Sequence, residues 1–253
     1  MDIVIIGSGN VATILGRKFK AAGHRIIQVV GRNASAASAL AYELDTESSN
    51  YMTLLNKNAE VYIIAVSDDA IEKVINDLKL PDKVVAHTAA AVPKEALKDV
   101  SEHYGVFYPL QSLRKEMPDV QDIPIYFDAS DDFAKKKLES LANSISSHIS
   151  VGSGDEERLK LHVAAVVVSN FVNHLYVLAE NYCQKEGISF KKLLPLIDET
   201  TQRIRTISPK ESQTGPAIRH DKETIQKHLE ILEAHPQLRN IYLLMTESIQ
   251  QVQ

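Results

Sequence analysis

A single cysteine, Cys183, occurs among the 253 residues. One cysteine excludes an internal disulfide, and without a second thiol nearby it is a poor metal ligand, so no metal site is expected. The chain also lacks an excess of positive charge, since 28 Lys and Arg stand against 33 Asp and Glu for a net charge of −5. This balance does not favour nucleic acid as a partner.

Long uninterrupted apolar runs are absent as well. None reaches the length of about 20 residues that a helix needs to cross a bilayer. The sequence starts directly with a strand-like segment instead of a charged segment followed by an apolar signal region. We therefore expect a cytoplasmic protein with no membrane partner. Hydrophobic residues make up 44% and charged residues 24%, which is typical of one large or two ordinary globular domains.

A dinucleotide-binding pattern is present at residues 2–33. The β-branched run Asp2–Ile6 predicts a buried parallel strand, and the segment that ends at Ala22 predicts a helix. Between them stand Gly7, Ser8, Gly9, Asn10, Val11 and Ala12. Gly7 permits a tight turn, Gly9 lets the backbone approach a pyrophosphate, and the helix presents free N–H groups to the phosphates.

The next predicted strand, Arg25–Val30, ends where the ribose of the adenosine should lie. An Asp or Glu there would bind the 2′-hydroxyl of NAD, but no carboxylate is present. Arg32 offers a guanidinium that suits a 2′-phosphate, so we predict NADP as the cofactor, with Asn33 beside it. The alternatives are a solvated turn for Arg32 and a glycine turn in an ordinary α/β protein for the whole pattern.

Strands and helices alternate as far as Val151. Strands are predicted at 61–66, 84–88, 104–112, 123–127 and 147–151, helices at 34–44, 70–78 and 131–144, and short helices at 51–55 and near 93. Seven or eight strands would form a doubly wound, mostly parallel Rossmann sheet. Pro109 is expected in a loop at the edge of the sheet, because proline in a central strand loses a ladder hydrogen bond.

Residues at the ends of the predicted strands are expected to face the nicotinamide half of the cofactor. They are Val66, Ser67, His87, Thr88 and Tyr108. For Ser67 or Asp68 the structural alternative is a cap on the helix that follows.

The pattern becomes helical after Gly152-Ser153-Gly154, where we place a domain boundary. The run 155–185 contains no proline or glycine and predicts a long central helix of a separate bundle. Further helices are expected at 190–208, at 222–234 and from 238 to the end. The predicted organisation is a Rossmann domain at residues 1–151 and an all-helical domain at 152–253. The apolar stretch 163–178 is hard for the remaining residues to cover, which predicts a homodimer through the C-terminal helices.

Several local signatures occur in order along the chain. They are Gly7–Ala12, Gly31-Arg32-Asn33, Ala65–Asp69, His87-Thr88, Tyr108–Ser112 and Thr214–Asp221. Together they resemble the Rossmann-like proteins whose C-terminal half is the domain of unknown function 2520. These proteins are similar to pyrroline-5-carboxylate reductase, to deazaflavin-dependent NADP oxidoreductases and, more distantly, to β-hydroxyacid dehydrogenases. The resemblance covers nearly the whole chain, and it implies an NADP-binding domain followed by a helical domain that commonly pairs two subunits.

The chain departs from this family at three places. Ala89-Ala90 stands where the family usually has Ser-Gly, Tyr108 where it usually has His, and His220 where Gly is common. The resemblance places each change in a loop near the expected nicotinamide site.

The long helix carries a polar face formed by Arg158, His162, Ser169 and Asn173. In β-hydroxyacid dehydrogenases a Lys is followed four residues later by an Asn, and similarity matches these positions to Arg158 and His162. His162 is the predicted proton donor, and the alternative for it is a hydrogen-bonded interior histidine. Further predicted catalytic residues are Asn170, Tyr108, His87 and Arg219. Arg219 would hold a substrate carboxylate, and Asp221 would orient it or cap the next helix.

These features predict an NADP-dependent oxidoreductase acting on a small molecule. It would reduce a carbonyl or imine that carries a carboxylate, at the cleft between the two domains. The alternative is a catalytically silent NADP-binding sensor or interaction protein. The departures from the family pattern in the loops at His87 and Tyr108 suggest this alternative.

Overall fold

The computed structural model describes residues 1–117, 122–152 and 154–251. By its internal contacts the chain divides into two compact units, Met1–Ser169 and Asn170–Gln253. Ser153, the middle residue of the predicted domain boundary, lies outside the described residues.

An eight-stranded sheet forms the centre of the first unit. Its strands are β1 (Asp2–Ile6), β2 (Arg25–Val30), β3 (Glu47–Ser49), β4 (Val61–Ile64), β5 (Val84–His87), β6 (His103–Pro109), β7 (Ile125–Ala129) and β8 (Ile149–Val151). The order is β3-β2-β1-β4-β5-β6-β7-β8, and all neighbouring pairs are parallel except β6 and β7. The predicted doubly wound, mostly parallel sheet is confirmed.

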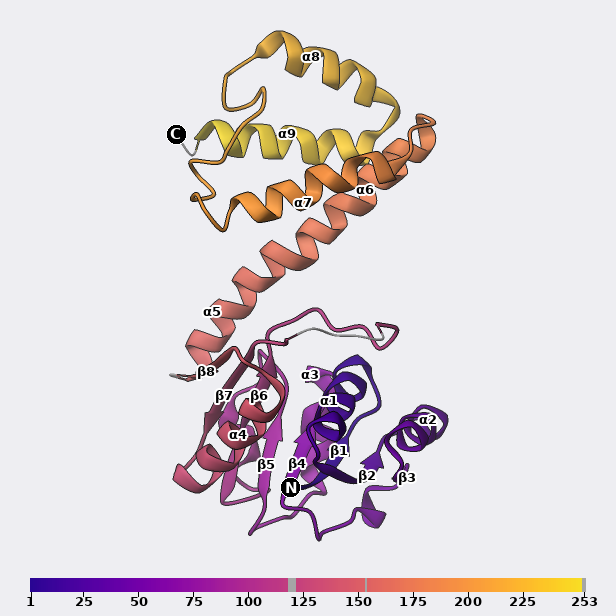
Figure 1. Ribbon diagram of the computed structural model, residues 1–253, viewed down its shortest axis with the longest axis vertical. Coiled ribbons are helices and arrows are strands. Elements are labelled where there is room, and N and C mark those ends of the chain that lie inside the picture. Colours follow the sequence, from indigo (N-terminus) through magenta and orange to yellow (C-terminus); the bar gives the residue numbers. More distant parts are fainter. Residues whose placement is uncertain (118–121, 153, 252–253) are drawn as a thin grey trace. The chain divides into compact units, whose positions relative to one another are not determined.

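Helices cover both faces of this sheet (Figure 1). They are α1 (Asn10–Ala21), α2 (Ala34–Leu44), α3 (Asp68–Asn76) and α4 (Asp132–Ile145), with short 3-10 helices η1 (Met52–Leu54) and η2 (Lys94–Leu97). Ile3 and Ile5 of β1 pack in one core cluster with side chains of α1, α2 and α4, whereas Val4 and Ile6 pack in a second cluster with α3. Both sides of β1 are therefore apolar surfaces, which explains its unbroken β-branched sequence.

Strand β3 was not predicted, because Glu47–Ser49 is polar and offers no apolar pattern. It pairs in parallel with β2 at the edge of the sheet. Its formation depends on that backbone pairing rather than on burial of its own side chains.

The expectation that Pro109 lies in a loop at the sheet edge is wrong. Pro109 is the last residue of β6, an inner strand between β5 and β7. The pairing of β6 with β5 ends at Val106, so Pro109 lies beyond the end of β5. The missing N–H of this proline therefore costs no hydrogen bond to β5. Tyr108, the residue before it, is thereby placed beyond the end of the neighbouring strand.

A long helix begins at Asp155 and continues to Lys185, as predicted. It consists of α5 (Asp155–Ala165), a π-helical segment η3 (Val166–Phe171) and α6 (Val172–Lys185). The division between the two units by internal contacts falls inside this helix, after Ser169. The cause is a set of polar contacts that tie the first turns of the helix to loops of the first unit, described below.

The described part of the second unit is helical. After α6 follow η4 (Phe190–Leu193), α7 (Leu194–Arg203), α8 (Lys222–Ile231), η5 (Leu232–Ala234) and α9 (Pro236–Gln251). These agree with the predicted helices, apart from ends that differ by a few residues. The fold is thus an α/β Rossmann sheet followed by an all-helical region.

By length and composition alone, the helix Asp155–Lys185 could cross a membrane. Its most apolar stretch has a mean hydropathy of 1.5 and is only 6% buried. Polar residues interrupt the apolar runs of this helix, so no single run predicts a membrane-spanning segment. Those interruptions between Lys160 and Glu180 are Ser, Asn and His without any full charge, which keeps the mean hydropathy high.

Candidate functional site

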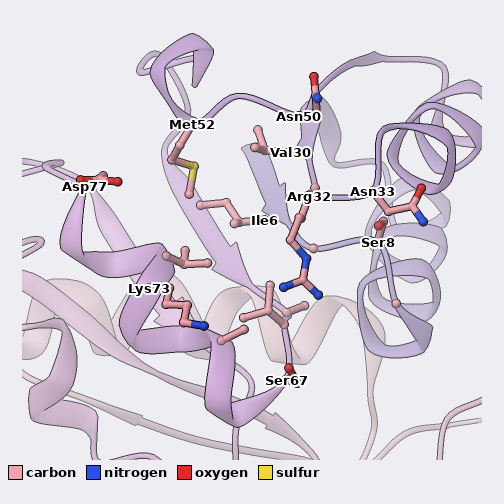
Figure 2. Close-up of a pocket in the computed structure, with 17 residues that line it drawn as sticks. Ile6, Ser8, Val30, Arg32, Asn33, Asn50, Met52, Ser67, Lys73 and Asp77 are labelled. Carbon is pink, nitrogen blue, oxygen red and sulfur yellow. The ribbon is translucent and has the colours of Figure 1, made fainter.

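A cavity of about 420 Å³ opens at the carboxyl ends of β1, β2 and β4, where the strand order reverses (Figure 2). It is lined by Ile6, Gly7, Ser8, Gly9, Val30, Gly31, Arg32, Asn33, Asn50, Met52, Ala65, Val66, Ser67, Ala70, Lys73, Val74 and Asp77. The glycine loop forms one wall, and the first residues after β2 form another. This is the position that a dinucleotide occupies in doubly wound sheets.

The glycine loop fits a pyrophosphate at two points. Gly7 has a φ of +131°, and a Cβ there would lie 2.1 Å from the carbonyl oxygen of Ala65, so only glycine is tolerated. A Cβ on Gly9 would meet nothing within 4 Å, which leaves open space over the start of α1. Gly9 is the N-cap of α1 and no side chain caps this end, so the first N–H groups of the helix can bind an anion.

Two cations line the adenosine side of this cavity. Arg32 follows β2 and Lys73 lies on α3, and Figure 2 shows both side chains directed into the same space. Asn33 faces the cavity too, but its Oδ1 accepts from the N–H of Ala36 at 3.0 Å and so caps α2. The arrangement suits a ligand with more than one negative charge at this end.

A second cavity of about 500 Å³ adjoins the first. Its lining residues are Gly9, Asn10, Val11, Ala65, Val66, Ser67, Asp68, Thr88, Ala89, Ala90, Tyr108 and His162. Gly9, Ala65, Val66 and Ser67 line both cavities, so an extended ligand can pass from one to the other. Every residue predicted to bind the cofactor lines one cavity or the other.

Tyr108 and His162 form a hydrogen-bonded pair at the second cavity. The Tyr108 hydroxyl oxygen lies 2.9 Å from His162 Nδ1, and the rings meet edge to face with centroids 6.0 Å apart. Burial raises the pKa of the Tyr108 phenol, the nearby Asp68 carboxylate raises it further, and Arg158 opposes them. The phenol is therefore protonated at neutral pH and can donate to Nδ1, which leaves the other ring nitrogen, Nε2, to carry the imidazole proton. The pair can take up and release a proton at the cavity wall.

Arg158 fixes the helix one turn before His162. Its side chain is fully buried and donates from Nε to the carbonyl oxygen of Ala90 at 3.0 Å and from Nη2 to that of Val92. Nη1 lies 2.7 Å from Oδ1 of Asp155, at ion-pair distance but without hydrogen-bond alignment. Arg158 thus joins α5 to the loop after β5, and it does not line either cavity.

His87, predicted as catalytic, is fully buried and outside both cavity linings. Its Nδ1 accepts from the N–H of Ala89 at 3.2 Å, and its Nε2 lies 3.4 Å from the carbonyl oxygen of Pro93. Burial, assisted by the charge of Arg158, lowers the pKa of His87 to about 4. The neutral imidazole therefore holds the loop at 88–93 in place.

Comparison with known proteins assigns the chain to a family. Residues 123–249, half of the chain, match the family described as a domain of unknown function (DUF2520). A proposed NADP oxidoreductase from Bacteroides fragilis is 34% identical, with a TM-score of 0.91 over 99% of this chain and 98% of that chain. The chain belongs to the DUF2520 family. Residues 2–91 match the family described as NADP oxidoreductase, coenzyme F420-dependent.

The predicted resemblance is confirmed. The family match also confirms the prediction of an NADP-dependent oxidoreductase. A reductive aminase from Aspergillus terreus in complex with NADPH and ethyl-5-oxohexanoate is 15% identical over 99% of this chain and 92% of that chain, with a TM-score of 0.70. A pyrroline-5-carboxylate reductase from Coxiella burnetii is 15% identical over 98% and 96%, with a TM-score of 0.61. At these identities the likeness shows the fold. No curated protein matches the chain at a significant level.

Asn170 and Arg219 belong to the second unit of this DUF2520 protein and line neither cavity. Asn170 is exposed within the π-helical segment, and Arg219 is exposed in the turn before α8. Asp221 caps α8 by accepting from the N–H of Thr224 at 3.1 Å, as its capping alternative predicts. His220, where the family commonly has Gly, adopts a φ of 52°, a conformation that glycine adopts at least cost. The predicted catalytic roles of Asn170 and Arg219 stay predictions.

Lys73 was not predicted as a cofactor residue, because an exposed lysine on a surface helix is typical of a solvated face. A signal was nevertheless present. The first cavity is lined by Ala70, Lys73 and Val74 of α3 and by its C-cap residue Asp77, and this spacing marks one face of a helix. That face follows β4 at the point where the strand order reverses, so it could have been assigned to the cofactor.

Proposed function

We propose that this protein uses NADPH to reduce a small carbonyl or imine in the second cavity. The observation that carries the proposal is the Tyr108–His162 pair, which faces a cavity continuous with the dinucleotide cavity. A hydride-transfer enzyme must hold the cofactor and manage one proton, and the residues around these two cavities are suited to both tasks.

The residues of the first cavity fit NADP as follows. The N–H groups at the start of α1 would bind the pyrophosphate, and Arg32 would bind the 2′-phosphate with Lys73 as a second cation. Val66, Ser67 and Thr88 would then border the nicotinamide half. When bound, NADPH supplies the hydride for the reduction.

The proton would come from the Tyr108–His162 pair. We assign His162 as the donor and Tyr108 as the group that orients it and shares its proton. Arg158 supports this role indirectly, because its buried contacts fix the helix turn that precedes His162. Ser112 and Ser169, whose hydroxyls are 2.8 Å apart, tie the helix to the loop after β6 on the other side.

Arg219 and Asn170 remain our candidates for contacts from the second unit, with Arg219 binding a substrate carboxylate. The test is steady-state kinetics of Arg219→Ala. We expect a raised KM for a substrate that carries a carboxylate and an unchanged KM for its methyl ester. Equal effects on both substrates would contradict the assignment.

We further propose a cytoplasmic homodimer formed through the C-terminal helices. Large apolar side chains are exposed along the long helix, among them Val163 (59%), Val167 (50%), Val168 (72%) and Phe171 (59%). Contiguous apolar surface of this kind marks an interface in a soluble protein. A second copy would cover it and would account for a membrane-like hydropathy without a membrane.

The alternative is a sensor that binds NADP without turnover, as the departures at Ala89, Ala90 and Tyr108 suggest. The two proposals differ in one measurement, the loss of NADPH absorbance with a panel of keto acids and cyclic imines. An enzyme oxidises NADPH with at least one member of the panel. A sensor binds NADPH, seen as a change in its fluorescence, and oxidises it with none.

A further inference from the structure

The second cavity has an unusual distribution of charge. Among the described residues that line it, Asp68 is the only Asp or Glu, and no Lys or Arg is present. Hydrogen-bonding groups are supplied by the pair described above and by Ser67 and Thr88. The cavity is therefore weakly negative.

The carboxylate of Asp68 faces the cavity from the first turn of α3. Its Oδ2 lies 3.4 Å from the backbone nitrogen of Ala91, which follows the lining residues Ala89 and Ala90. After burial, the Asp68 carboxylate is the second cause of the raised pKa of the Tyr108 phenol, which lines the same cavity. No ion pair engages Asp68 within the part of the chain that the structure describes.

Two features argue against a purely structural role for this charge. The helix dipole favours an acidic residue in the first turn of α3, but Asp69 already satisfies that preference and does not line the cavity. Arg158 is paired with Asp155 and bound to two carbonyl oxygens, so its partners do not include Asp68. Arg32 and Lys73 line the other cavity.

We propose that Asp68 is the counter-charge for a protonated imine, and that this cavity takes cationic imine substrates and ammonium products in preference to neutral carbonyl compounds. The inference rests on the proposed function and narrows its substrate class. A carboxylate beside the reacting centre stabilises an iminium cation. The same carboxylate repels the alkoxide that forms when a carbonyl is reduced, so carbonyl reduction is disfavoured.

The reaction balances with one proton. The imine nitrogen first accepts a proton from the Tyr108–His162 pair, which recovers it from water. The iminium carbon then accepts a hydride from NADPH, a carbon–hydrogen bond forms, and the π electrons of the carbon–nitrogen bond become the lone pair of the amine. One imine, one proton and one NADPH give one amine and one NADP⁺. The amine leaves as an ammonium ion after protonation by water.

The test compares two ligands of nearly equal shape, benzylammonium and benzyl alcohol, the products of imine and carbonyl reduction respectively. Their affinities are measured by calorimetry on the full chain with saturating NADP⁺. We expect benzylammonium to bind at least tenfold tighter, a difference of about 1.4 kcal/mol. In Asp68→Asn, whose amide oxygen can still accept from Ala91, the preference should vanish. In Asp68→Glu, which keeps the charge, it should persist at least in part.

Equal affinities in the native protein, or a preference that survives in Asp68→Asn, would overturn the inference. NADPH binding is titrated separately by fluorescence in all three proteins and should be unchanged. If the native protein oxidises NADPH with a ketone and Asp68→Asn is equally active, the proposed function holds and the role of Asp68 fails. If NADPH does not bind at all, the proposed function itself fails.

Discussion

The hydroxyl of Tyr108 lies 2.9 Å from Nδ1 of His162, so the end of an inner strand meets the second turn of a helix at the wall of one cavity. Each residue depends on a separate support. Tyr108 is carried past the end of β5 by the extra length of β6, and His162 is fixed by the buried Arg158 one turn earlier. The pair is therefore held in place before any substrate binds, which is what a proton donor requires.

Replacing Tyr108 with Phe removes the hydroxyl while keeping the ring. We expect the rate of the chemical step to fall at least tenfold, because His162 loses the group that orients and shares its proton. NADPH affinity should stay within about twofold of native. Single-turnover NADPH oxidation and fluorescence titration measure the two quantities, and a variant with native turnover would contradict the assignment.

The affinities for NADPH and NADH test the proposed roles of Arg32 and Lys73, the two cations of the first cavity. NADPH should bind at least tenfold tighter than NADH, about 1.4 kcal/mol, and Arg32→Asp should reverse the order. Lys73→Ala should weaken binding of 2′,5′-ADP about threefold or more and leave 5′-AMP nearly unchanged, since only the former carries the 2′-phosphate.

The matched control for Lys73 is Lys98→Ala, an exposed lysine outside both cavities. It should leave both nucleotides unaffected. Equal titration curves for NADPH and NADH in the native protein would contradict the role of Arg32. Equal losses for the two nucleotides in Lys73→Ala would contradict a contact with the 2′-phosphate.

The buried His87 predicts a pH dependence of stability. Its pKa is lowered to about 4, so the folded protein binds this proton less readily than the unfolded chain, where the pKa is about 6.5. The stabilisation is therefore complete above pH 6.5 and is lost as the pH falls towards 4. The loss is on the order of 3 kcal/mol.

His87→Asn keeps an oxygen that can accept from the N–H of Ala89 but cannot titrate. Its free energy of unfolding, measured in urea at a series of pH values, should decrease less steeply than that of the native protein between pH 6.5 and 4. Parallel profiles for the two proteins would show that His87 does not contribute in this way.

The proposed homodimer predicts a mass of twice 28.1 kDa by light scattering at micromolar concentration. Val168→Asp places a charge on the exposed apolar surface of the long helix and should give monomers, because an unpaired buried charge is costly at an interface. Tyr42→Asp, at an exposed site on α2, should leave the mass unchanged. A native protein that is monomeric under these conditions would contradict the proposal.

The sequence predicts the cofactor half of this protein well because its signals are local. The β-branched strand β1, the glycine loop and the first residues after β2 are adjacent in the chain, and each is explained by backbone conformation or by one side chain. The strand ends at Ser67 and Thr88 follow from the same rule about parallel sheets. The glycine loop, the first residues after β2 and these strand ends line the two cavities.

The features that were missed depend on contacts between distant segments. The hydrogen bond between Tyr108 and His162 joins residues 54 positions apart, and the buried Arg158 reaches a carbonyl oxygen 68 positions away. Periodicity alone places Arg158 on the same helix face as His162, but it cannot tell that one is buried against a loop and the other faces a cavity. The inner position of β6 was missed for the same reason, since strand pairing is not encoded in any single segment.

The central claim is that the second cavity carries out NADPH-dependent reduction with His162 as the proton donor. Single-turnover oxidation of bound NADPH by native protein and by His162→Ala, with an imine or ketone from the panel that the native protein turns over, tests it most directly. The account predicts a rate about a hundredfold or more lower in the variant, equivalent to about 2.7 kcal/mol, with NADPH affinity nearly unchanged. A variant with native affinity and native rate would contradict it.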